Sequence, residues 1–252
     1  MAVTGVDAWL LRMGDNALVL GQRLSEWCGH APALEEDIAL ANTALDLIGQ
    51  AQMWLGLSGE IEGKKHSADD LAFLRDVWDF RNVLLVEQPN GDFGQTMMRQ
   101  FLFDAWHVEM LRALTTSRRR EISEIAEKAV KEASYHLDRS QAVVIGLGDG
   151  TDESRARMQA ALDLLWPYVG ELCTPDALDH DMAEAEIAPD LDSLRSAYLT
   201  RLADVLEAAT LTRPEDSFAH QGGKTGTRHS EHLGHMLTQM QWLQRAYPGA
   251  QW

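Results

Sequence analysis

The prolines of this chain divide it into long segments that favour helix. Six of the seven stand between such segments, namely Pro32, Pro89, Pro175, Pro189, Pro214 and Pro248. Proline lacks a backbone donor and clashes with the preceding turn, so helices usually end near it. The stretches between are rich in Ala, Leu and Glu, with few β-branched runs and no strand-like alternation. The pattern predicts an all-α protein, organised as one domain over residues 1–252.

The expected helices have recognisable start and stop signals. Ser67 with Asp70, and Thr151 with Asp152, are typical of helix N-termini. The Gly-rich stretches 146–150 and 222–226 are typical of loops, and Pro167 should kink the helix that contains it. The expected helical ranges are 7–27, 33–57, 68–86, 94–117, 120–145, 152–173, 191–211 and 229–246.

Charge and cysteine content narrow the class of protein. The 252 residues include 39 acidic and 22 basic ones, a formal net charge of −17, which argues against nucleic acid or an anionic membrane as partner. Cys28 and Cys173 are too few for a disulfide framework and are expected in or near the core. No signal peptide is evident, and no apolar run approaches the roughly 18–20 residues of a membrane span. We expect a cytoplasmic protein.

Ionisable side chains lie within the apolar faces of two expected helices. At about 100° per residue, Asp104 and His107 fall on the apolar stripe of the fourth helix, and Glu132 and His136 on that of the fifth. The second helix is apolar around most of its circumference, except for a narrow polar row that includes Asp46. Buried carboxylates and imidazoles are costly unless they are paired or bind metal. The pattern therefore predicts a buried polar centre within a helical bundle.

A di-iron centre is one interpretation of these residues. Di-iron bundles use two lone acids and two Glu-x-x-His pairs from four helices. Asp46 and Glu132 fit the lone acids, and Asp104–His107 (DAWH) is a degenerate first pair. The nearest match to the second pair is Asp163–Trp166 (DLLW), which has tryptophan in place of histidine. The ligands that the second Glu-x-x-His pair would supply are therefore missing.

Three interpretations of the polar centre remain from the residues alone: an intact di-iron site, a single weakly held metal, and a metal-free network. In the third, Asp104, His107, Glu132 and His136 neutralise one another by charged hydrogen bonds across two packed helices. The ligand count favours this third interpretation.

A second histidine group, His229, His232 and His235, lies at the start of the last expected helix. On a helix the outer two would be about 120° apart, so one metal cannot easily use all three. We expect His229, Glu231 and His232 to begin the helix and to bond a neighbouring loop. The stretch Gly222–Gly226 lacks the spacing and the preceding strand of a phosphate loop.

Tryptophan is abundant, with eight residues. Most of those on helical segments are expected in the core, namely Trp9, Trp27, Trp54, Trp78, Trp106 and Trp166. Trp242 and Trp252, close to Met236, Met240 and Leu243, are better candidates for a partner surface. The apolar helix at 38–57 needs cover on every side, from its own domain or from a second subunit.

Several longer stretches carry a resemblance to a known family. They are LRMGDN (11–16), QRLSEWCGHAPAL (22–34), LDLIGQ (45–50), LLVEQPNGDF (84–93), DAWH (104–107), KEASYH (131–136), GGKTGTRHSEHLG (222–234) and residues 241–252. With them the chain resembles, over nearly its whole length, the C-subunit family of the bacterial ring-1,2-phenylacetyl-CoA epoxidase, a multicomponent oxygenase of phenylacetate catabolism. The strings EWCGHAP and LLVEQPNGDF are the specific ones.

The resemblance implies a ferritin-like fold, a four-helix-bundle core with additional helices, and a non-catalytic structural role. In that family a related catalytic A subunit holds the di-iron site and binds the CoA thioester. Small B subunits bridge such pairs, and a flavin and iron–sulfur reductase delivers electrons from NADPH.

We therefore expect no catalytic, cofactor-binding or metal-binding residue in this chain. The candidates for a vestigial di-iron site are Asp46, Asp104, His107, Glu132 and His136. The alternatives are a di-iron oxidase in its own right, and a stand-alone ferritin-like binding protein that forms a homodimer.

Overall fold

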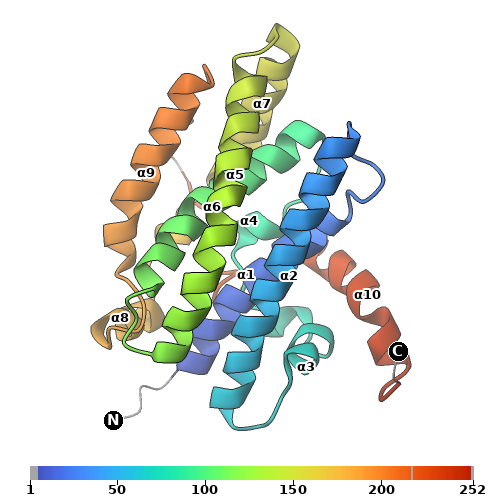
Figure 1. Cartoon of the computed structure of the whole chain (residues 1–252), viewed down its shortest axis with the longest axis vertical. Coiled ribbons are helices and arrows are strands. Elements are labelled where there is room, and N and C mark those ends of the chain that lie inside the picture. Colours follow the sequence, from blue (N-terminus) through green and yellow to red (C-terminus); the bar gives the residue numbers. More distant parts are fainter. Residues whose placement is uncertain (1–4, 217, 251–252) are drawn as a thin grey trace. The chain divides into compact units, whose positions relative to one another are not determined.

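A computed structural model describes residues 5–216 and 218–250, which contain helices and loops but no strand (Figure 1). The all-α prediction is confirmed. The α-helices are α1 (Val6–Ser25), α2 (Leu34–Glu62), α3 (Ala68–Phe73), α4 (Leu84–Glu87), α5 (Phe93–Leu114), α6 (Arg120–Gly148), α7 (Asp152–Leu165), α8 (Ala177–Glu184), α9 (Leu191–Ala208) and α10 (Glu231–Ala246). Short 3₁₀-helices are η1 (Val77–Asp79), η2 (Trp166–Tyr168) and η3 (Gly170–Cys173).

The chain forms two compact units, each with its own core. The first comprises Met1–Pro89 and Gln221–Trp252, and the second comprises Asn90–His220. Among the described residues, the first unit therefore contains α1–α4 and α10, and the second contains α5–α9. That residues 1–252 make a single domain remains a prediction.

The first unit is built around the antiparallel pair α1 and α2 (Figure 1). Small residues let these helices approach closely: a Cβ added to Gly14 would lie 2.6 Å from Leu55 Cδ2, and one on Gly21 would lie 3.3 Å from the Ala44 carbonyl oxygen. Larger side chains there would push the helices apart and open the core. Helices α4 and α10 both contact α1, so the last helix returns to the unit that began the chain.

The second unit is built around the antiparallel pair α5 and α6, with α7 and α9 against both of them. Helix α5 is buried along most of its length, whereas α6 has one apolar face and one solvated face. Gly148 at the end of α6 allows another close contact, because a Cβ there would lie 2.3 Å from the Ala209 carbonyl oxygen. Because α5 is buried along most of its length, its polar side chains are surrounded by protein rather than by water.

The expected helix over 68–86 is wrong. Helix α3 begins with the predicted Ser67–Asp70 capping box, but it ends at Phe73. A second capping box, between Asp76 and Asp79, starts η1, and α4 follows only at Leu84. The apolar residues of this stretch are thus divided among three short pieces, of which α4 is buried and η1 is not.

The sixth expected helix also ends early. Helix α7 stops at Leu165, and Pro167 starts a 3₁₀ turn instead of kinking a continuing helix, because proline cannot supply the next intrahelical donor. The short helix α8 was not expected, although its capping box between Asp176 and Asp179 is visible in the sequence.

Burial corrects the expectation for one cysteine and confirms that most of the helical tryptophans lie in the core. Cys173 is buried as expected, but Cys28 is exposed, so its placement in or near the core is wrong. Four of the six helical tryptophans are buried, Trp27 is half-buried and Trp78 is 62% exposed. Trp242 is exposed, as a partner surface requires, and Trp252 lies outside the described residues.

Helix α2 leaves an apolar stripe uncovered. Leu34, Ile38, Leu45 and Ile48 follow one another on one face, and Leu34 and Leu45 are 72% and 66% exposed. The polar row through Asp46 is half-buried at that position. Within the described residues, no helix has both the length and the apolar content needed to cross a membrane.

Candidate functional site

The predicted polar centre lies in the second unit, on the facing sides of α5 and α6. We call it the Asp104 cluster: Gln100, Asp104 and His107 from α5, and His136 and Ser140 from α6. The spacing of three or four residues within each helix places these side chains on one face. All five are buried, so every charge among them must be compensated inside the protein.

The Asp104 carboxylate accepts its hydrogen bonds from neutral groups. Gln100 Nε2 donates to Oδ1 at 2.7 Å, and Ser140 Oγ donates to Oδ2 at 2.8 Å. Burial raises the pKa of Asp104 to about 6, against the opposing effects of the positive charge on His136 and of these two hydrogen bonds. Burial therefore makes Asp104 easier to protonate than an exposed aspartate.

His107 is a neutral ring in an aromatic environment. Burial lowers its pKa to about 3, with a smaller contribution from the charge of His136. The ring lies 5.0 Å from Phe103 and is stacked on Trp106 at 6.3 Å, centroid to centroid. Its Nδ1 is buried without a hydrogen-bond partner among the described residues.

The expected network of charged hydrogen bonds stays a prediction. Gln100 and Ser140 donate to Asp104, and the charge of His136 also acts on this carboxylate. Glu132 is only half-buried on α6, and Asp46 belongs to α2 of the first unit. The two hydrogen bonds described for Asp104 thus come from neutral side chains.

The donor set does not fit a di-iron pair. In the degenerate second pair, Asp163 is exposed and accepts a hydrogen bond from Gln159 Nε2 at 2.8 Å. Trp166 is buried and donates from Nε1 to Asp216 at 3.1 Å. Over residues 5–216 and 218–250, no three His, Cys, Asp or Glu side chains come together as they would around a metal ion.

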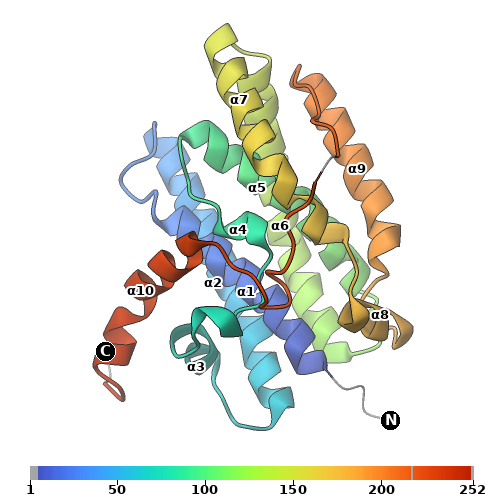
Figure 2. The same ribbon diagram turned by 180° about the vertical axis from the view of Figure 1, so that it is seen from behind.

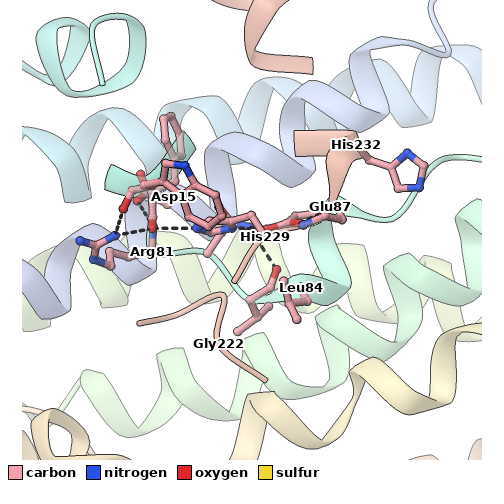
Figure 3. A network of polar contacts seen from close by, with 12 residues as sticks. Asp15, Arg81, Leu84, Glu87, Gly222, His229 and His232 are labelled. Atoms are coloured by element: carbon pink, nitrogen blue, oxygen red, sulfur yellow. Dashed lines mark hydrogen bonds and ion pairs between the residues drawn. The ribbon is translucent and has the colours of Figure 1, made fainter. Parts of the chain in front are cut away.

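A second buried polar group, which is not predicted from the sequence, lies in the first unit (Figure 3). We call it the Glu87 network: Glu87 with Asn82, His229 and Ser230. Glu87 Oε1 accepts from Asn82 Nδ2 at 2.9 Å and faces His229 Nδ1 at 2.5 Å. Oε2 accepts from the Ser230 backbone N–H and hydroxyl, both at 2.7 Å. Each carboxylate oxygen of Glu87 therefore has two donors.

The Glu87 network fastens the start of α10 to α4. His229 Nε2 faces the Phe80 carbonyl oxygen at 3.2 Å, so a doubly protonated ring can donate to acceptors on both sides. Arg23 donates to the Glu87 carbonyl at 2.8 Å and to the His232 carbonyl at 3.1 Å. The prediction that His229 bonds a neighbouring loop is confirmed. His235 is exposed, and the His232 ring lies outside the network (Figure 3).

Asp15, which is labelled in Figure 3, forms a second ion pair of the first unit, with Arg75. Both terminal nitrogens of Arg75 bind its carboxylate, and the Arg81 backbone N–H donates to Oδ2 at 2.8 Å. The Arg75 guanidinium also lies 4.4 Å from the centre of the Phe80 ring. This pair holds the irregular segment between α3 and α4 against α1.

The sequence contains a partial signal for these missed residues. Glu87 follows the apolar run Leu84–Val86, and Asp15 interrupts the apolar residues of the first helix. A buried acid in such a run requires a partner. The partners are far away in sequence, however: His229 is 142 residues from Glu87, and Arg75 is 60 from Asp15.

Fold and polar clusters together define an all-α protein whose buried acids have structural partners. A family model described as "Phenylacetic acid catabolic protein" matches residues 4–252. The chain belongs to this family, which is ferritin-like. It is 49% identical over 247 residues to the C subunit of the 1,2-phenylacetyl-CoA epoxidase of Escherichia coli (strain K12), a match that covers 98% of this chain and 99% of that protein.

Proposed function

We propose that this protein is the C subunit of a phenylacetyl-CoA epoxidase and acts in aerobic phenylacetate degradation as its non-catalytic structural subunit. It pairs with the di-iron catalytic subunit and stabilises it. The near full-length similarity to the C subunit of the Escherichia coli epoxidase supports the assignment to such a complex. The structural role rests on the chemistry of the Asp104 cluster.

The observation that carries the structural role is the state of the candidate ligands. A di-iron pair that activates oxygen is held by several ionised carboxylates and by two imidazoles. Here the two oxygens of Asp104 are engaged by Gln100 and Ser140, and tryptophan stands at position 166 in place of the second imidazole. The di-iron centre, the flavin, the iron–sulfur cluster and the NADPH site then belong to the catalytic subunit and the reductase.

The apolar surface of the chain supports pairing. The exposed stripe Leu34, Ile38, Leu45 and Ile48 on α2 has the spacing that a partner helix can follow. Trp242 on α10 adds an exposed aromatic side chain of the kind that is enriched in interfaces. A small bridging subunit and the reductase complete the proposed assembly.

Co-purification with a tagged catalytic subunit tests the proposal. We expect a stable stoichiometric complex in which iron follows the catalytic subunit, and no bound iron in the isolated chain. Failure to form the complex contradicts the proposal. So do two tightly bound irons in the isolated chain that are lost on Asp104→Asn, which would favour a di-iron oxidase. A fixed homodimer that ignores the catalytic subunit would favour a stand-alone binding protein.

Surface variants refine the test. Leu45→Glu places a charge in the α2 stripe and should weaken the complex while the isolated chain stays folded. Leu164→Glu is the matched control, because Leu164 is also an exposed leucine of a helix, 53% exposed on α7. In the complex, Asp104→Asn should leave turnover per assembled catalytic subunit unchanged.

A further inference from the structure

We propose that the second unit contains a binding site for a small aromatic carboxylate. The site is a cavity of about 300 Å³ lined by residues of η2, η3 and α9 and by Asp216, Phe218 and Ala219. This volume lies at the lower end of the roughly 300–1,000 Å³ that is usual for small-molecule sites. The inference concerns the isolated chain and does not depend on the proposed subunit role.

About half of the cavity lining is apolar or aromatic, and the rest is polar. Trp166, Val169, Leu199 and Phe218 line it, together with Cys173 and Tyr198. The Tyr198 hydroxyl is already used, since it donates to the Leu102 carbonyl oxygen at 3.0 Å. Burial raises the pKa of Tyr198 well above its usual value, so the phenol stays neutral. A flat aromatic group fits such a lining.

The wall formed by the segment after α9 is held in place by specific contacts. This segment runs back beside the end of α7 (Figure 2), where the His220 backbone N–H donates to the Pro167 carbonyl at 2.7 Å. Asp216 accepts from Trp166 Nε1 at 3.1 Å and from Arg213 Nη2 at 2.5 Å. Both oxygens of Asp216 are thus engaged, and Arg213 neutralises its charge at the cavity edge.

Arg195 supplies the charge that selects the ligand. Its side chain lines the cavity from α9 and has neither a hydrogen bond nor an ion pair within the part of the chain that the structure describes. Many other arginines of this acidic chain are paired, for example Arg112 with Glu109 at 2.8 Å. A planar guanidinium binds a carboxylate through two parallel hydrogen bonds. An aromatic ring in the cavity would place its carboxylate at this group.

Three isosteric probes of different charge test the proposal on the full chain: benzoate, neutral benzamide and cationic benzamidine. Ligand-observed NMR titration should give the tightest binding for benzoate, weaker binding for benzamide and none for benzamidine. Loss of the charged contact in Arg195→Gln should weaken benzoate by about ten- to a hundredfold and leave benzamide unchanged. Arg112→Gln, outside the cavity, is the matched control and should bind benzoate normally.

A cavity-filling variant separates the site from general attraction to an arginine. Leu199→Trp should abolish binding of benzoate and benzamide alike while the thermal unfolding midpoint stays close to that of the natural chain. Absence of benzoate binding to the natural chain would overturn the proposal. Equal binding of the three probes, or benzoate binding that is unchanged in both Arg195→Gln and Leu199→Trp, would also overturn it.

Discussion

Glu87 in the first unit and Asp104 in the second are both 0% exposed, yet they are surrounded differently. Glu87 faces four donors, which include a histidine ring and a backbone N–H. Asp104 accepts two hydrogen bonds, both from neutral side chains. The partners of Glu87 come from segments far apart in the chain, whereas those of Asp104 lie on the adjacent helices α5 and α6.

This difference shows that burial alone does not determine how much a carboxylate contributes to the stability of the fold. A buried carboxylate with a full set of donors holds distant segments together, and removing it leaves several polar groups unpaired. A buried carboxylate with two donors gains from taking up a proton, so its contribution depends on pH. The Glu87 network is therefore expected to matter for stability at neutral pH, and the Asp104 cluster much less.

The largest effect is expected for Glu87→Ala. The variant leaves His229, Asn82 and the Ser230 N–H without their shared acceptor in a buried place, which costs about 3–5 kcal/mol of unfolding free energy. Urea unfolding measures this loss, and limited proteolysis should show cleavage near residues 221–232. The exposed acid Glu153, varied to Gln, is the control and should stay within about 0.5 kcal/mol. A small loss for Glu87→Ala would break the comparison.

Asp104→Asn should have an effect whose size depends on pH. The pKa of Asp104 is raised in the folded state to about 6 from 3.8, so its stabilising contribution is present below pH 3.8 and is lost as the pH rises through 6. The variant does not titrate. It should therefore gain stability relative to the natural chain by about 1.4 kcal/mol per pH unit across this window, on the order of 2–3 kcal/mol in total.

Unfolding curves of both proteins from about pH 4 to pH 8 check this slope. Gln100 and Ser140 can turn to suit the new amide, so no large loss is expected at the acid end. A destabilised variant at neutral pH would show that ionised Asp104 supports the fold, which would erase the contrast with Glu87.

His229→Gln should cost about 1–2 kcal/mol, less than the loss of Glu87 itself. The change removes a charge-assisted hydrogen bond, but Asn82 and Ser230 still donate to the carboxylate. Chemical denaturation measures the cost. An equal loss in His229→Gln and Glu87→Ala would mean that the histidine contact accounts for the whole network.

The smallest effect is expected for His107→Leu, within about 1 kcal/mol at neutral pH, because a neutral ring without a partner on Nδ1 is replaced by an apolar group of similar volume. The pKa of His107 is lowered to about 3 from 6.5. The natural ring therefore loses stability as the pH falls below 6.5, and the variant should gain on the natural chain there. Unfolding at pH 8 and at pH 5 distinguishes this from a simple packing defect.

The long helices are predictable from the sequence to within a few residues. Their apolar periodicity extends over many turns and ends at prolines and glycines, so local rules suffice. These rules fail for the stretch 68–86. There the Arg75 side chain binds Asp15, which lies 60 residues earlier in the sequence, and the helix does not continue. The unexpected helix α8 has a capping box at Asp176 that could have been found.

The candidate site also has a part that the sequence predicts and a part that it does not. Asp104, His107 and His136 are found from the sequence because three- and four-residue spacings place them on one helical face. The hydrogen bonds of Asp104 are not predicted from the sequence. Ser140 lies one turn further along α6 and Gln100 is a neutral residue, so a search for charged pairs does not find them. The partners of Glu87 depend entirely on the fold.

The unequal placement of the two thiols makes the protein easy to label at one position. Cys28 is exposed, and Cys173 is buried. Cys28 lies on a turn after α1 that is anchored by the Asp37 carboxylate, which accepts from the Gly29 N–H at 2.8 Å. A maleimide dye or nitroxide should therefore react at Cys28 first and report on the association of subunits without the introduction of a new cysteine.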